Sequence, residues 1–78
     1  MTKDQVRTLV ADILAGIAPE ADLSAVRDDE DLREALDLDS MDMLNLVTAL
    51  HERTGRDIPE EDTPRLVTLA GIAAFFGA

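Results

Sequence analysis

The sequence predicts an all-α fold, a small four-helix bundle with three longer helices, one short third helix and a long first loop. Apolar residues recur at spacings of three and four over much of the 78-residue chain, which is the pattern of helices with one buried face. No segment alternates apolar and polar residues in the manner of a half-buried strand. A chain of this length supports one modest core, so we expect residues 1–78 to form a single domain.

The first helix is predicted to begin after Thr2. Thr2 and Gln5 have the spacing of a capping box, in which each side chain bonds to the backbone N–H of the other residue. Gly16 and Pro19 are expected to end this helix. Between them runs one apolar stripe at helical spacing, which we expect to lie in the core: Val6, Leu9, Val10, Ile13, Leu14 and Ile17.

A long acidic connection, residues 17–39, follows the first helix. Loops of this length in compact domains are often functional. Its scattered apolar residues are expected to pin it across the helix ends, and residues 31–35 to form a brief helical turn. Four consecutive acids at residues 28–31 could suggest calcium, but a loop counted from Asp29 places Glu34 where the EF-hand needs glycine. A solvated acidic face is the better interpretation, and we expect no metal site.

The second long helix is predicted over residues 40–53, with Ser40 as a candidate N-cap and Gly55 as its end. At about 100° per residue, one face carries the expected core residues Met43, Leu46, Val47 and Leu50. A second stripe beside it carries Met41, Leu44, Thr48 and His51. This stripe is either a contact surface for partners or the margin of the core.

The C-terminal part is predicted to contain a short helix and a last helix. Ile58 should be extended because it precedes Pro59. Thr63 and Pro64 resemble an N-cap followed by proline at the first helical position, and Thr68 resembles the next N-cap. Gly71 is expected to weaken the last helix. Its expected core stripe is Leu69, Ile72, Ala73 and Phe76, and Phe75 is also expected in the core.

Acidic residues dominate the charge, with 17 Asp and Glu against seven Lys and Arg and a net charge of −10. Such a surface repels nucleic acid and anionic lipid and attracts proteins with basic patches. We therefore expect protein partners, no nucleic acid, no membrane and a monomer. The chain has no Cys and no evident export or membrane-spanning segment, so the expected location is the cytoplasm.

Catalysis by the chain itself is not predicted. The single His51 lies eleven residues after Ser40 on the same predicted helix, about 16 Å away at 1.5 Å per residue. It therefore cannot activate that serine within one chain. The sequence also contains no glycine-rich phosphate loop and no nucleophile elbow.

Residues 36–42, Leu-Asp-Leu-Asp-Ser-Met-Asp, resemble the attachment site of acyl carrier proteins, which has an Asp-Ser-Leu core followed by an acidic residue. The resemblance covers nearly the whole chain. An amphipathic helix and a long loop precede the Asp-Ser helix, and an Ile-Pro-acidic link at residues 58–62 and two further helices follow it. The bundle is thus expected to be of the acyl-carrier type.

The resemblance implies a stand-alone acyl carrier protein. Ser40 would accept 4′-phosphopantetheine from a phosphopantetheinyl transferase, and the thiol of that group would carry acyl groups as thioesters in fatty-acid, polyketide or related specialised biosynthesis. Asp39 would help to dock the transferase. Acyl-loading and acyl-processing enzymes with basic patches would dock on Met41, Asp42, Leu44, Asn45, Thr48 and Glu61. The acyl group would be sheltered by Met41, Met43, Leu46 and Phe76.

Several positions depart from the family pattern. Asp37 stands where many members have glycine, so a different backbone is expected before the serine. Met41, Asn45 and Thr54 replace a usual Leu, a common Glu and a frequent aromatic residue. These changes favour a dedicated carrier in a specialised pathway as much as one in housekeeping fatty-acid synthesis. The alternatives are an aminoacyl or peptidyl carrier and an unmodified acidic interaction module.

Overall fold

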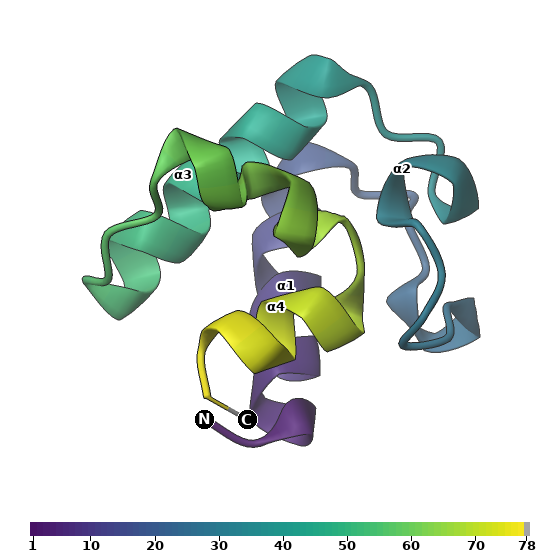
Figure 1. Ribbon diagram of the computed structural model, residues 1–78. Coiled ribbons are helices and arrows are strands. Elements are labelled where there is room, and N and C mark those ends of the chain that lie inside the picture. Colours follow the sequence, from purple (N-terminus) through teal and green to yellow (C-terminus); the bar gives the residue numbers. More distant parts are fainter. Residues whose placement is uncertain (78) are drawn as a thin grey trace.

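Two long helices frame the molecule in the computed structural model, which describes residues 1–77 (Figure 1). Helices α1 (Lys3–Ile17) and α3 (Ser40–Thr54) each have 15 residues and pack against each other. The 3₁₀ helix η2 (Glu60–Val67) contacts α3, and α4 (Leu69–Phe75) contacts both η2 and α1. No strand occurs among the described residues, so the predicted all-α bundle is confirmed.

Helix α1 begins as its sequence predicts. The Thr2 hydroxyl accepts from the Gln5 N–H, and the Gln5 side chain accepts from the Thr2 N–H. The helix ends at Ile17, with Ala18 as C-cap. The prediction that Gly16 ends it is wrong, because Gly16 lies inside the helix. Pro19 is the effective stop, since a residue before proline is disfavoured in the α region and Ala18 has φ −138° and ψ 83°.

The long connection is more ordered than a plain loop. It contains the 3₁₀ turn η1 (Leu23–Ala25) and the short helix α2 (Leu32–Ala35), which Asp31 caps. Arg7 of α1 holds the connection by donating to the carbonyls of Leu23 and Val26, at 2.9 and 3.1 Å. It also pairs with the Asp28 carboxylate at 2.7 Å. No sequence pattern pointed to Arg7, because its partners lie 16 to 21 residues away.

One core lies between the helices. Phe75 is buried, whereas Phe76 and Val47 are only partly buried and pack against its edge. Both aromatic residues were expected in the core, and this is confirmed for Phe75, whereas Phe76 of the expected stripe lies only at the core's edge. Helix α4 ends at Phe75, and Phe76 is its C-cap. The largest fully buried side chains are Leu14, Leu32, Leu46, Leu50, Leu66, Ile72, Val6 and Val10.

The third helix starts earlier than predicted. η2 begins at Glu60 after Pro59, and no side chain caps it, so Thr63 is not its N-cap. Three acids in its first turn, at residues 60–62, favour this start because they face the positive end of the helix dipole. Pro64 lies inside the segment. Since proline has no N–H to donate, it opposes a regular α-helix here.

Gly71 of α4 has a packing role that its helix propensity does not suggest. A Cβ atom at this position would lie 1.8 Å from the Arg65 carbonyl oxygen of η2. Only glycine allows the two backbones to approach so closely. Thr68 caps α4 as predicted, accepting from the Gly71 N–H at 2.9 Å.

None of the helices in residues 1–77 has both the length and the apolar character needed to cross a membrane.

Candidate functional site

The start of α3 presents a serine whose hydroxyl is left free. Asp39, not Ser40, is the N-cap: its Oδ1 accepts from the Asp42 N–H at 2.8 Å. The Asp42 carboxylate accepts in return from the Asp39 N–H at 3.3 Å. The prediction of Ser40 as N-cap is therefore wrong by one residue, and Ser40 is the first residue of the helix. It is exposed, and its side chain makes no hydrogen bond within the described residues.

Asp37 directs the chain toward this helix start. It has φ 55° and is the non-glycine residue with positive φ in the described chain. The following Leu38 N–H donates to the Arg33 carbonyl at 3.0 Å, which closes the end of α2, and Leu38 is buried. This is the helix ending that glycine usually supplies, and aspartate tolerates it better than most residues. Asp37 thus adopts a conformation that glycine favours, contrary to the expected change of backbone.

Ser40 borders an open cavity of about 600 Å³ between α3 and η2. Met43 and Leu44 line it from α3, and Arg33 reaches it from α2. The lining from η2 consists of Glu60, Thr63, Pro64 and Val67. The lining is mostly apolar and carries one positive and one negative side chain.

The residues expected to shelter an acyl group are only partly brought together. Met43 lines the cavity, but Leu46 is completely buried in the core. Met41 is 61% exposed on the surface. Phe76 packs edge-on against Phe75 at the end of α4 and is not part of the lining. The η2 residues were not predicted, because the sequence did not show where a cavity would lie.

The predicted docking residues lie on α3 and, for Glu61, on η2, and most of them are exposed. Met41 and Leu44 are 61% and 57% exposed, so they do not fill the margin of the core. Asn45, Thr48 and Glu61 are also exposed. Asp42 is half-buried, because its carboxylate takes part in the capping box.

Arg33, which lines the cavity, forms an ion pair with Asp31. Arg33 donates from Nε and Nη2 to the two carboxylate oxygens of Asp31, at 3.0 and 2.6 Å. These hydrogen bonds from Arg33 lower the pKa of the Asp31 carboxyl. They also raise the pKa of the Arg33 guanidinium, which therefore remains charged.

Other candidate chemistry is absent from the site. His51 lies near the opposite end of α3, where its Nδ1 is 2.8 Å from the Arg56 carbonyl oxygen. It does not meet Ser40, as predicted from its spacing. Residues 1–77 contain no group of three or more His, Cys, Asp or Glu side chains placed to hold a metal ion.

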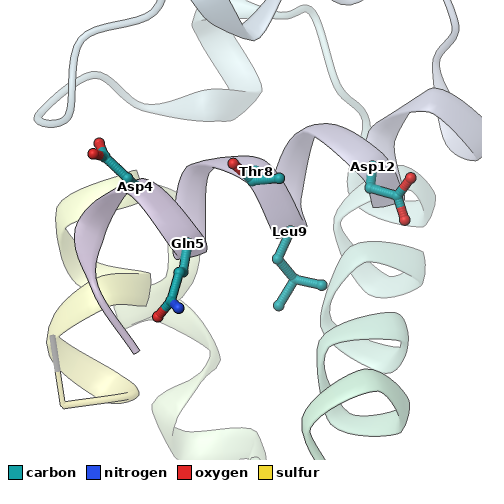
Figure 2. A pocket seen from close by; sticks show the side chains of 5 residues that line it. All are labelled: Asp4, Gln5, Thr8, Leu9 and Asp12. Atoms are coloured by element: carbon teal, nitrogen blue, oxygen red, sulfur yellow. The ribbon is translucent and has the colours of Figure 1, made fainter.

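A second hollow, of about 490 Å³, lies along α1 (Figure 2). Gln5 and Leu9 point to the same side of the helix, and Asp4, Thr8 and Asp12 complete the lining. All five residues come from one helix, and none belongs to the cavity at Ser40. This hollow is therefore separate from the candidate site.

The geometry defines a class of protein that presents an exposed serine, Ser40, at the start of a helix. This serine lies beside a cavity and between two acidic residues, Asp39 and Asp42. The profile of the family described as "Phosphopantetheine attachment site" matches residues 4–76. The acyl carrier protein of Campylobacter hominis is 32% identical over 72 residues, which cover 92% of this chain and 85% of that protein. Polyketide-8 synthase acyl carrier protein 2 of Streptomyces avermitilis is 34% identical, over 91% of this chain and 76% of that protein.

The chain belongs to the acyl carrier protein family. Its function is that of an acyl carrier, and its covalent prosthetic group is 4′-phosphopantetheine. Members of this family are carriers rather than catalysts, and they interact with phosphopantetheinyl transferases and biosynthetic enzymes. The resemblance inferred from the Asp-Ser segment is thereby confirmed.

Proposed function

We propose that Ser40 is the residue to which 4′-phosphopantetheine is attached. The observation that carries this proposal is the division of roles at the start of α3, where Asp39 caps the helix and leaves the Ser40 hydroxyl exposed. The other serine of the chain, Ser24, is engaged, because its hydroxyl donates to Asp22 at 2.5 Å. Of the two serines, Ser40 is thus the one whose hydroxyl is available for attachment of the prosthetic group.

The chain itself needs only to present and position this group. When attached, 4′-phosphopantetheine supplies the thiol that holds an acyl group, in a protein that contains no Cys. Ser40 borders the cavity between α3 and η2, whose apolar lining residues Met43, Leu44 and Val67 suit an acyl chain. The first N–H groups of α3 favour a negatively charged substituent at the adjacent serine.

The partners are proposed to dock beside Ser40. Asp39 and Asp42 are acids at the helix start, and Met41 and Leu44 are exposed apolar side chains on the same helix. Asn45, Thr48 and Glu61 extend this surface. Acids around an apolar contact favour fast and reversible binding to basic enzyme surfaces, which suits a carrier that must leave each enzyme after its reaction.

The same reasoning gives the wider proposal of a monomeric, stand-alone, single-domain carrier without enzymatic activity of its own. The two relatives described above are matched over 85% and 76% of their lengths, which supports a separate domain. Fatty-acid, polyketide or related specialised biosynthesis is the proposed setting, since both a general acyl carrier protein and a polyketide synthase carrier are similar. A chain without Cys fits the reducing cytoplasm.

The test is the intact mass of the protein before and after incubation with a broad-specificity phosphopantetheinyl transferase and coenzyme A. We expect a gain of one phosphopantetheine in the wild type and in Ser24→Ala, and no gain in Ser40→Ala. A gain in Ser40→Ala would contradict the assignment. No gain in the wild type with several transferases would instead favour an unmodified interaction module.

A further inference from the structure

Arg33 is the basic side chain that lines the cavity beside Ser40 within the described residues. This position is unusual in a chain with a net charge of −10. The five other arginines are engaged elsewhere by ion pairs or aromatic rings: Arg7 with Asp28, Arg27 with Asp29 and Glu30, Arg53 with Asp12, Arg65 with Asp62, and Arg56 over Phe75.

The structure holds Arg33 in place without using all its donors. Its guanidinium donates from Nε and Nη2 to the two carboxylate oxygens of Asp31, at 3.0 and 2.6 Å. A guanidinium has five N–H donors, so this pair leaves three of them available, and the side chain is 53% exposed. Its backbone carbonyl accepts from Leu38, which links α2 directly to the segment that precedes Ser40. The backbone of Arg33 is therefore tied to the segment before α3, and Asp31 holds its guanidinium.

A phosphodiester on Ser40 would add negative charge beside two carboxylates at the start of α3. Asp39 and Asp42, the two carboxylates of the capping box, stand on either side of Ser40 in the sequence. A further negative charge on Ser40 would be repelled by both, and the repulsion is strongest where salt does not screen it. A nearby guanidinium offsets this repulsion and offers a donor geometry suited to phosphate oxygens.

We infer that Arg33 binds the phosphodiester of the prosthetic group on Ser40, an inference that rests on the proposed attachment at that serine. The phosphodiester is preferred over a carboxylate of the carried acyl group, because it is joined directly to Ser40 whereas the acyl group is at the far end of the arm. Arg33 thus positions the first part of the arm along the cavity between α3 and η2.

The test observes the Nε–Hε signals of the arginines by ¹H–¹⁵N NMR in the unmodified protein and after transfer of the arm, with intact mass as proof of loading. We expect the Arg33 signal to move on loading and the Arg27 signal to remain. Acetyl- and malonyl-loaded forms are recorded beside them. A response of Arg33 that appears only with the malonyl form would assign it to the acyl carboxylate and overturn the inference.

Equilibrium unfolding of Arg33→Gln gives a second readout that does not depend on activity. Loading should lower the folding equilibrium constant of Arg33→Gln about two- to fivefold more than that of the wild type at low salt, as for an exposed charge pair. Arg27→Gln is the matched control and should follow the wild type. Full loading with an unmoved Arg33 signal and equal unfolding effects would overturn this inference alone. A wild-type protein that accepts no arm would overturn it together with the proposed function.

Discussion

At the scale of single residues, the site depends on which of two neighbours caps α3. Asp39 and Ser40 are both good N-cap types, and their side chains are next to each other in the sequence. The backbone selects Asp39, which has the extended φ of −89° and ψ of −178° that a cap requires. Its carboxylate takes over the capping hydrogen bond, and the serine remains available for modification.

This division of roles predicts that two alanine substitutions lower the free energy of unfolding by different amounts. Asp39→Ala should lower the free energy of unfolding by about 1 kcal/mol, because it removes the cap. Ser40→Ala should change it by less than about 0.5 kcal/mol, because an exposed side chain without a hydrogen bond is lost. Urea unfolding of both variants measures the difference. A larger loss in Ser40→Ala than in Asp39→Ala would show that the serine is the cap.

Asp37 is the second residue on which the approach to the site depends. Its φ of 55° lies in the left-handed region, which costs β-branched residues most. Asp37→Val should destabilise the protein by about 1–2 kcal/mol, whereas Asp37→Gly should be neutral or stabilising within about 1 kcal/mol. Asp29→Val, at an exposed position without positive φ, is the control for the change of side chain. Equal effects of valine at both positions in thermal unfolding would rule out backbone strain at Asp37.

At the scale of elements, the features that the sequence predicted correctly depend on adjacent residues, although the local predictions at Gly16, Ser40 and Thr63 were wrong. The capping box of Thr2, the left-handed end of α3 at Gly55 and the cap at Thr68 are all local, and the structure has them. Features that depend on the fold were not predictable in this way. Arg7 binds residues 16 to 21 positions away, and Gly71 is needed because η2 approaches α4.

The contact between η2 and α4 predicts an unusual response to a helix-favouring substitution. Gly71→Ala should destabilise the protein by about 1–3 kcal/mol, because its Cβ would lie 1.8 Å from the Arg65 carbonyl oxygen. Gly16→Ala is the matched control, since nothing lies within 4 Å of a Cβ there. It should stabilise α1 by about 0.5–1 kcal/mol. If both variants proved more stable in urea unfolding, the close approach of the two helices would be refuted.

At the scale of the whole molecule, the fold and the site are linked by the order of elements along the chain. The connection between α1 and α3 contacts α4, where the Ala70 N–H donates to the Asp28 carbonyl at 2.9 Å. It then continues through α2 to Asp39, which caps the start of α3. The family and the serine could be inferred from the Asp-Ser segment and the order of helices. The cavity lining could not, because it depends on how the faces of η2 and α2 are turned toward α3.

Charge acts on the whole molecule and leads to a last prediction. With 17 acidic and seven basic residues, repulsion among the acids opposes the compact state, and added salt screens it. Salt also weakens the ion pairs, such as that of Arg53 with Asp12, but exposed pairs contribute little. The melting temperature should therefore rise between about 10 mM and 200 mM NaCl, where the Debye length falls from about 30 Å to below 10 Å. Asp12→Asn, which removes one acid and this pair, should show a smaller rise of the melting temperature with salt. A melting temperature that fell with salt would mean that the ion pairs outweigh the repulsion.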